Sequence, residues 1–331
     1  MIVVQFAATA LVIVLAGVRL ARYGDVLGEK TGLGRNWIGV VLLAATTSLP
    51  ELFTGFGATA LAPLPDIAIG DVLGSCMFNL LILSLMDAVQ PEPISARAHQ
   101  GHALSIGFGL LLVGVAAVGL VAGGHVPALG GIGLYSPVLI ALYFVAMRVI
   151  FAHQRQTRAR EIEEVADELH YRQITLRAAV GHYSVAAVAV VLAALWLPRL
   201  AAELARQTGL GEAFVGSLFV AITTSLPEVV VSLAAVRIGA LDLGIGNVLG
   251  SNLFNMLILG LDDVFYRHGP LLADAGPSHA VAVTAIVMMN GLFLVGLTYK
   301  AMTKRFVVTW DTGAIAAVYV AAVALSYQMT R

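Results

Sequence analysis

Long apolar segments alternate with short polar connections along almost the whole chain. Ten such segments can be distinguished, at 2–18, 37–60, 67–89, 103–122, 129–151, 179–198, 212–236, 243–265, 279–299 and 313–329. Most hold about 20 residues, and a helix of about 20 residues crosses the roughly 30 Å hydrocarbon core of a bilayer. The pattern therefore predicts an all-α membrane protein with ten transmembrane helices.

The longest polar stretch, 152–177, divides these segments into five and five. We expect a first five-helix half at 1–151, a linker at 152–177 and a second five-helix half at 178–331. Because five crossings is an odd number, the second half must enter the membrane from the side opposite to the first. The two halves are predicted to have inverted topologies.

Short motifs recur in the two halves at a nearly constant offset. TGLG at 31–34 recurs at 208–211, and TTSLPE at 46–51 recurs at 223–228. GDVLGSCMFN at 70–79 is answered by GNVLGSNLFN at 246–255. Inverted repeats of this kind are typical of secondary transporters, whose binding sites lie near the bilayer midplane where the repeats meet.

Composition and charge agree with a membrane protein and exclude other classes. Hydrophobic residues make up 59% of the chain and charged residues 12%, against about 25% charged residues in soluble domains. The net charge of −1 does not indicate a nucleic-acid partner, and Cys76 is the single cysteine, so no intrachain disulfide can form. Fifteen Lys and Arg residues fall on the side opposite the N-terminus and four on its own side. The positive-inside rule then places both termini outside and the 152–177 loop in the cytoplasm.

Two carboxylates lie at membrane depth, Glu51 and Glu228, each as the last residue of a TTSLPE motif. An ionised carboxylate near the bilayer centre costs at least about 2.5 kcal/mol, so it is expected to face a cavity or a cation. A buried, protonated Glu would explain one such residue. Two at equivalent positions of an inverted repeat favour a shared cation site.

Oxygen-bearing side chains accompany both carboxylates. The residues at i−4 and i−3 are Thr and Ser in each motif, so we expect their hydroxyls on the same helical face as the Glu. Pro50 and Pro227 lack an N–H, which frees the carbonyls of Thr46 and Thr223. A second polar stripe has Ser and Asn at i and i+4, and its alternative role is to hold helices together. Hard cations prefer such oxygen ligands; the candidates are Thr47, Ser48, Thr224, Ser225, Ser75, Asn79, Ser251 and Asn255.

These paired motifs resemble those of the Ca²⁺/cation antiporter superfamily, in particular its sodium/calcium exchanger branch. The repeats of that family read roughly G-T-S-x-P-E and G-N-x-x-G-S-N-x-x-[ND]. The resemblance implies that Glu51 and Glu228 are the central ligands for Ca²⁺ and Na⁺ and that the hydroxyl and amide residues just named contribute. It also implies that the backbone carbonyls of Ala44 and Ala221 complete the site, and that the first and sixth helices slide across the other eight.

The chain departs from the family pattern at several positions. Thr46 and Thr223 stand where glycine is usual, Cys76 replaces Asn, and both Asn79 and Asn255 are neutral where one is often Asp. Asp71 also stands where Asn is usual, whereas Asn247 keeps the expected residue in the other half. Asp71 either extends the Ser75 stripe as an accessory ligand or merely occupies a helix start, where the helix dipole favours an anion; the sequence leaves both open.

The leading hypothesis is a secondary antiporter that exchanges Ca²⁺ for Na⁺ by alternating access. Two ionised glutamates balance one Ca²⁺ or two Na⁺, so a third Na⁺ would lack a formal countercharge. Ca²⁺/H⁺ exchange therefore stays open as the alternative. A passive cation channel and a non-transporting ion sensor rank below both. No motif of an enzyme or an ATP-driven pump is present, and no cofactor is expected. We expect an integral protein of a prokaryotic inner or plasma membrane whose partners are ions and lipid, and the sequence gives no oligomeric state.

Overall fold

The computed structural model describes residues 2–329 apart from 34, 62–63, 126, 165–170, 172, 209–219, 301–302 and 305. Of the residues that the structure describes, 84% are helical. Within the described ranges, eight helices are long and apolar enough to span a membrane, or nine if the bent pair Ile38–Thr47 and Leu49–Leu61 is one span. The predicted segment 212–236 begins in residues outside these ranges. The helical membrane fold is therefore confirmed, whereas the count of ten stays a prediction.

The elements follow one another in chain order. The first part of the chain holds α1 (Ile2–Thr31), α2 (Arg35–Trp37), η1 (Ile38–Leu43), α3 (Ala44–Thr47), α4 (Leu49–Phe56), η2 (Gly57–Leu61), α5 (Pro65–Ala88), α6 (Ile94–Arg97), α7 (His102–Ala122), η3 (Gly123–His125), β1 (Ala128–Leu129), β2 (Ile132–Gly133) and α8 (Tyr135–Glu164). The second part holds α9 (Leu176–Thr208), α11 (Val220–Thr224), α12 (Leu226–Arg237), α13 (Leu241–Phe265), η5 (Leu271–Asp274), α14 (His279–Tyr299) and α15 (Trp310–Met329).

Several predicted boundaries differ from these elements, among them the end of the segment predicted at 179–198, since α9 continues to Thr208. The helix α1 continues to Thr31, well beyond the predicted end at 18. The segment predicted to begin at 129 starts with the antiparallel hairpin β1–β2, whose turn needs positive φ at Gly130 and Gly131. Glycine adopts such φ values without steric cost, so the turn forms there and α8 begins only at Tyr135. α8 then extends through 152–164, which the sequence assigned to the linker.

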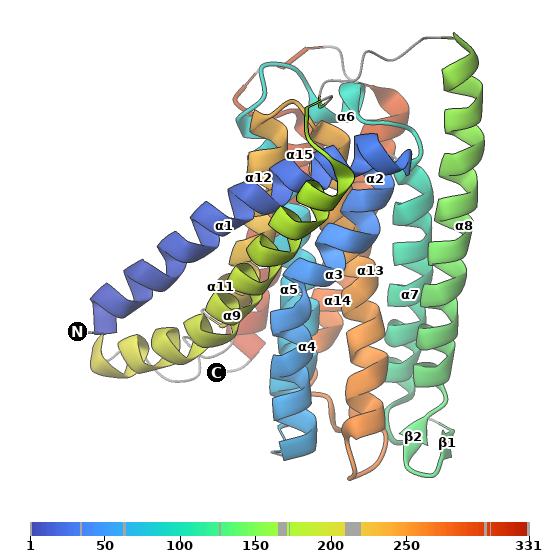
Figure 1. The fold of residues 1–331 in the computed structure, drawn as a ribbon. Coiled ribbons are helices and arrows are strands. Elements are labelled where there is room, and N and C mark those ends of the chain that lie inside the picture. The colour runs from blue at the N-terminus through green and yellow to red at the C-terminus, as the bar shows by residue number, and fades with distance from the viewer. Residues whose placement is uncertain are drawn as a thin grey trace.

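The ribbon has two differently oriented groups of helices. In Figure 1, α1 and α9 run side by side and diagonally across one face, whereas α5, α7, α8 and α13 stand roughly parallel to one another. The apolar window of α13 is 94% buried, against 17% for α1. The close packing of η1 on α13 depends on Gly39 and Gly250, where an added Cβ would lie 2.4 and 2.2 Å from a backbone oxygen. α13 is thus central and α1 peripheral.

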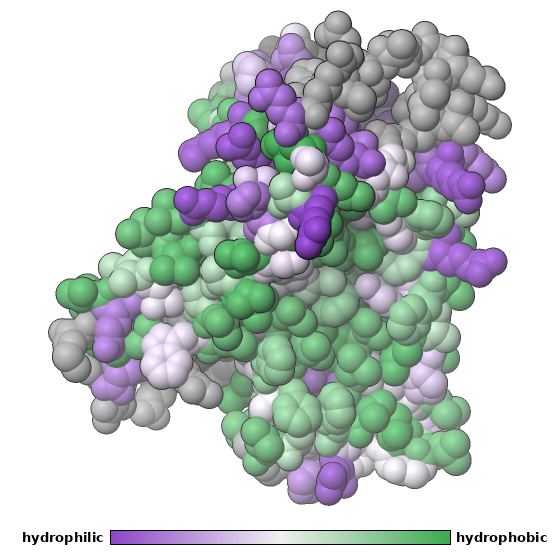
Figure 2. All heavy atoms as spheres, viewed as in Figure 1, coloured by the Kyte–Doolittle hydropathy of each residue, from purple (hydrophilic) through white to green (hydrophobic). Residues whose placement is uncertain are grey.

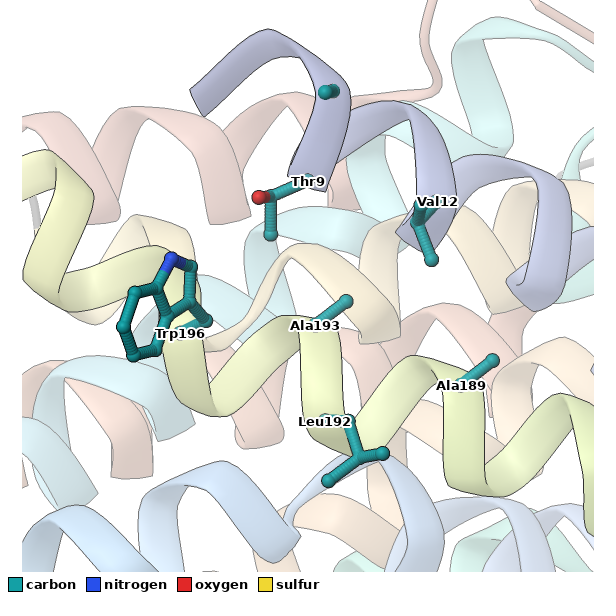
Figure 3. Close-up of a pocket in the computed structure, with 7 residues that line it drawn as sticks. Thr9, Val12, Ala189, Leu192, Ala193 and Trp196 are labelled. Carbon is teal, nitrogen blue, oxygen red and sulfur yellow. The ribbon is translucent and has the colours of Figure 1, made fainter. Parts of the chain in front are cut away.

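An apolar groove of about 440 Å³ lies between α1 and α9. Figure 3 shows Thr9 and Val12 of α1 facing Ala189, Ala193 and Trp196 of α9. The Thr9 hydroxyl donates to the Gln5 carbonyl of its own helix, 2.8 Å away, and no residue that lines the groove is charged. The groove offers a surface for hydrocarbon and no ligands for a cation.

The surface of the molecule is apolar over its middle. Figure 2 shows hydrophobic residues over most of the visible face and hydrophilic residues gathered mainly at its upper end. Large side chains such as Val121, Leu192 and Phe144 are more than half exposed. Exposed apolar surface on this scale matches a lipid environment, so the chain is an integral membrane protein.

Two buried aspartates make the same contacts in the two parts of the chain. Asp87 accepts hydrogen bonds from the Ile94 amide at 3.0 Å and the Thr309 amide at 2.7 Å. Asp263 accepts them from the Leu271 amide at 2.6 Å and the Gly133 amide at 2.9 Å. Every residue of the second set lies 176 or 177 positions from its counterpart. Each aspartate therefore ties the loop after its own helix to the start of a helix in the other part of the chain.

Two histidine–aspartate pairs show the same inverted relation. His102 Nε2 lies 2.9 Å from Asp242 Oδ1, and His279 Nε2 lies 2.9 Å from Asp66 Oδ1. Each aspartate precedes or opens a long central helix, α5 or α13, and each histidine opens a helix that packs on it. The starts of α5 and α13 are thus fixed by equivalent polar contacts.

One polar contact joins the end of the predicted linker to α1. The Tyr171 hydroxyl donates to Asp25 at 2.9 Å, and its amide donates to Glu29 at 3.0 Å. Burial and the hydrogen bond to Asp25 raise the pKa of Tyr171 to about 12. The phenol therefore stays protonated and donates at neutral pH. Arg35 forms an ion pair with the same carboxylate.

Candidate ion-binding site

The two TTSLPE motifs each form a broken helix. The axis bends by 43° between Ile38–Thr47 and Leu49–Leu61. Ser48 lies at the break with φ −92° and ψ 10°, and Ser225 has the matching φ −83° and ψ 6° between α11 and α12. A proline follows two positions later, where its missing N–H cannot continue the preceding helix. The break places Glu51 and Glu228 in the first turn of a new helix, where the dipole stabilises a negative charge.

Both glutamates are fully buried. Glu51 and Glu228 have no exposed surface, and the Oε2 atom of each lacks a hydrogen-bond partner among the described residues. The two carboxyls lie near enough to interact electrostatically. In the part of the chain that the structure describes, no Lys or Arg forms a salt bridge with either of them. An added cation would provide the opposite charge.

Each glutamate receives a hydrogen bond from the serine of the other motif. The Ser48 hydroxyl donates to Glu228 Oε1 at 3.0 Å, and the Ser225 hydroxyl donates to Glu51 Oε1 at 3.4 Å. The sequence predicts each serine on the helical face of its own glutamate, whereas in the structure its hydroxyl bonds to the glutamate of the other motif. The helix break turns the hydroxyl away from that face, so each carboxyl depends on both motifs.

The serines of the central helices complete the two carboxyl environments. Ser75 of α5 donates to Glu51 Oε1 and Ser251 of α13 donates to Glu228 Oε1, both at 3.4 Å. The Ser225 hydroxyl also donates to Ser75 at 3.0 Å. Four serines from two broken helices and two straight ones thus converge on two glutamates.

The threonines of the motifs lie one position before the serines. Each contacts the central helix of the other part of the chain, α13 for Thr47 and α5 for Thr224. Thr47 Oγ1 lies 3.3 Å from Asn247 Oδ1 and 3.4 Å from the Ser251 hydroxyl. Thr224 Oγ1 lies 3.3 Å from Asp71 Oδ1. Both hydroxyls are buried at the edge of the serine cluster. They are positioned to serve as ligands, and that role stays a proposal.

The two asparagines lie farther along the stripes. The Asn79 amide donates to Asn252 Oδ1 at 3.1 Å, which leaves its own Oδ1 without a partner. Asn255 is fully buried, and neither of its amide atoms has a partner among the described residues. Neither asparagine bonds to a glutamate. The Asn79 oxygen is available to a ligand. The Cys76 thiol lies 4.0 Å from the Asn252 carbonyl and also interacts with the side chain of Asn255.

The predicted carbonyl ligands have less support. The Ala44 carbonyl already accepts hydrogen bonds from the Ser48 amide at 3.0 Å and from Thr47 Oγ1 at 3.3 Å. Ala221 occupies the equivalent place in α11. Their participation stays a prediction.

The motifs in the sequence do not identify Asp262 as a candidate site residue. It lies in the apolar segment 243–265, is fully buried and has no hydrogen-bond partner for either oxygen in the described ranges. A carboxylate inside an apolar segment was the available signal. It was overlooked because Asp262 has no acidic counterpart in the other half, where Met86 stands 176 positions earlier.

Comparison with known proteins gives consistent matches over most of the chain. The family model described as "Sodium/calcium exchanger protein" matches residues 1–151 and 179–328. The inner membrane protein YrbG of Escherichia coli is 31% identical over 253 residues, which cover 76% of this chain and 76% of YrbG. The uncharacterized membrane protein MJ0091 of Methanocaldococcus jannaschii is 25% identical over 94% of this chain and 95% of its own length.

Solved structures agree with the fold. A structure of the sodium-calcium exchanger NCX_Mj superposes with a TM-score of 0.75 at 23% identity, and the match covers 98% of this chain and 99% of that one. The family model matches both sides of the 152–177 stretch, and the two TTSLPE motifs lie within the matched residues. This chain therefore belongs to the sodium/calcium exchanger family, a family of cation transporters rather than enzymes.

Proposed function

We propose that this chain exchanges Ca²⁺ for Na⁺ across the membrane and that Glu51 and Glu228 hold the two ions in turn. One observation carries the proposal. Two fully buried carboxyls at equivalent positions of the repeat each accept a hydrogen bond from the serine of the opposite motif. Each keeps an oxygen without a hydrogen-bond partner among the described residues.

The charge of the site favours exchange. Two ionised glutamates balance one Ca²⁺ or two Na⁺, and Coulomb energies are large where the surroundings have a low dielectric constant. Because neither ion can add to a site that the other already neutralises, binding of one opposes binding of the other. Competition for a single site is the basis of antiport.

The arrangement of α1 and α9 supports alternating access. These two helices pack against each other and lie across the bundle (Figure 1), and the apolar groove shown in Figure 3 lies between them. α1 also contacts α12, the helix that carries Glu228. Small and aliphatic residues mediate this contact, as at Gly17, where an added Cβ would lie 2.7 Å from Val230. A smooth apolar interface of this kind permits sliding.

Flux in proteoliposomes tests the proposal. Purified protein is reconstituted into Na⁺-loaded vesicles, and ⁴⁵Ca²⁺ uptake is followed after dilution into Na⁺-free buffer. We expect uptake that depends on the outward Na⁺ gradient and collapses when internal Na⁺ is replaced by choline. Uptake that is indifferent to Na⁺ would remove sodium as the coupling ion. A channel would equilibrate ⁴⁵Ca²⁺ with no counter-ion, and a sensor would bind it without flux.

Ca²⁺/H⁺ exchange is the second candidate. The neutral side chains of Asn79 and Asn255 favour it, because the central site holds no third carboxylate for a third Na⁺. It predicts ⁴⁵Ca²⁺ uptake driven by an acidic vesicle interior in the absence of Na⁺. A fluorescent pH probe in the same vesicles would then report alkalinisation during uptake.

We also propose that both termini face outside and that 152–177 is cytoplasmic, as the Lys and Arg distribution indicates. Two exposed positions test this, Leu129 in the β1–β2 hairpin and Glu92 after α5. In a Cys76→Ser background, an impermeant thiol reagent added to intact cells should label Leu129→Cys and spare Glu92→Cys. The reverse labelling would invert the orientation.

A further inference from the structure

The layers on the two sides of the glutamate pair are chemically different. Three positions define each layer, and they correspond at offsets of 176 or 177: Gly55 with Ser232, Asp71 with Asn247, and Met86 with Asp262. One layer, which we call the neutral layer, consists of Ser232, Asn247 and Met86. The other, the acidic layer, consists of Gly55, Asp71 and Asp262.

The neutral layer is closed by its own hydrogen bonds. The Asn247 amide donates to the Ser232 hydroxyl at 3.0 Å, and that hydroxyl lies 3.4 Å from the Gly244 carbonyl. The Asn247 Oδ1 atom accepts from Thr47. The methyl end of Met86 packs on Gly244, 2.9 Å from where a Cβ would stand. This layer carries no charge and requires no further ligand.

The acidic layer holds two carboxyls that are not satisfied. Asp262 is fully buried, and neither of its oxygens has a hydrogen-bond partner among the described residues. Its carboxyl fills the space that Gly55 leaves, since a Cβ there would lie 2.3 and 2.5 Å from the two oxygens. Asp71 is 4% exposed, and its Oδ2 atom also lacks a partner in these ranges. The two carboxyls interact electrostatically.

The acidic layer adjoins the central site. Gly55 follows Glu51 by four residues on α4, and Asp71 precedes Ser75 by four residues on α5. Four residues are about one helical turn, or roughly 5.4–6 Å. Thr224 connects the two levels, because it donates to Asp71 and stands beside Ser225, which donates to Glu51. A cation could thus contact the acidic layer and remain adjacent to the glutamate pair.

A bound cation is one way to stabilise buried carboxylate oxygens that lack hydrogen-bond donors, and protonation is the other. We propose that Asp71 and Asp262 form a second cation-binding site, one helical turn from the glutamate pair, which takes a small hard cation of the kind the protein exchanges, Na⁺ or Ca²⁺. Thr224 adds a hydroxyl oxygen. This inference rests on the proposed function. The two aspartates supply the negative charge that the neutral Asn79 and Asn255 lack. Asp71 lies on the same polar stripe of α5 as Ser75 and Asn79, at the end opposite Asn79.

The number of bound ions tests the second site directly. Equilibrium binding of ²²Na⁺ and of ⁴⁵Ca²⁺ to purified protein in detergent is measured for wild type, Asp262→Asn and Asp71→Asn. Asp71→Asn installs the residue that the other half carries, and Asp262→Asn keeps the side-chain shape. We expect both variants to lose one bound ion per chain, or to bind it at least about 10-fold more weakly. The isotope that shows the loss identifies the ion.

The chain provides a matched control at the mirror position. Met86→Leu alters the neutral layer at the counterpart of Asp262 and should leave the number of bound ions unchanged. Size-exclusion chromatography and thermal unfolding establish that each variant is folded. If Asp262→Asn does not fold, Asp71→Asn alone provides the test. Asparagine should be tolerated at position 71, because Asn247 occupies the equivalent position in the other half.

The outcomes separate this inference from the proposed function. Wild-type numbers and affinities of both ions in folded Asp71→Asn and Asp262→Asn would overturn the second site and leave the glutamate site intact. Folded Glu51→Gln should lose central binding and transport but still bind one ion in the acidic layer. Full transport by Glu51→Gln would instead refute the proposed function.

Discussion

The two halves are nearly identical around the glutamate pair and different one helical turn away from it. At the centre, each glutamate receives a hydrogen bond from a serine of its own half and from one of the other. One turn away, the neutral layer closes on itself, whereas the acidic layer keeps unpaired carboxylate oxygens within the described chain. The shared centre is what alternating exposure of one site requires. Because only one layer carries carboxyl groups, a cation that approaches the glutamate pair from that side would meet negative charge, and one from the other side would not.

Removal of either central carboxylate should have the largest effect. Glu51→Gln and Glu228→Gln each keep the side-chain shape but remove one of the two charges that balance the ion. We expect ⁴⁵Ca²⁺ flux to fall at least about 100-fold in both, because a lost charge at a low-dielectric site costs several kcal/mol. Elution as a monodisperse peak on size exclusion establishes folding. If only one variant lost transport, the two halves would not share one site.

Asp87 and Asp263 should contribute equally to the stability of the folded protein. Asp87→Ala and Asp263→Ala each leave several buried donors without an acceptor, among them the amides of Thr309 and Gly133. Each unsatisfied group costs about 1–3 kcal/mol. Thermal unfolding in detergent should show a clear fall in Tm for both variants. An unchanged Tm in one of them would show that the repeated contacts are not equivalent in energy.

A glycine contrast sharpens the difference between the layers. Gly55→Ala would place a methyl group against the Asp262 carboxyl, and we expect a loss of about 1–3 kcal/mol in unfolding free energy. Ser232→Ala, at the counterpart position, removes one hydroxyl and should cost about 1 kcal/mol. Chemical denaturation of both variants measures the two losses. Equal losses would mean that the Asp262 side chain can move away from the added methyl group at little cost. That result would contradict the tight packing of Asp262 on Gly55.

The smallest effect is expected on α9. The Tyr183 hydroxyl donates to the Leu42 carbonyl at 3.0 Å and lies 3.1 Å from Thr46 Oγ1, whereas Phe6, its counterpart 177 positions earlier on α1, has no hydroxyl. Loss of one such bond is worth about 0.5–1.5 kcal/mol. Tyr183→Phe should therefore change the maximal exchange rate by about 2- to 10-fold while the protein stays folded. Phe6→Leu serves as the control without a polar contact, and an equal change there would argue against a role for the hydroxyl.

The sequence predicts the features that depend on local pattern and repetition. The segment 279–299 coincides with α14, and both TTSLPE strings form the broken helices that surround the candidate site. The offset of 176–177 could also have identified Asp87 with Asp263 and His102 with His279, had it been followed beyond the motifs. Tertiary relations could not be predicted in this way. Ser48 bonds to Glu228, 180 positions away, whereas helical periodicity alone placed its hydroxyl on the face of Glu51.

The exchange of serines between the motifs has an evolutionary consequence. One half alone provides Glu51 with Ser75 but lacks the hydroxyl that only the other half supplies. An ancestor that consisted of one half could have built this environment only as a pair of copies inserted in opposite orientations. Fusion of two such genes would free each copy to mutate separately, so that an aspartate such as Asp71 could charge one face of the molecule while the other stays neutral.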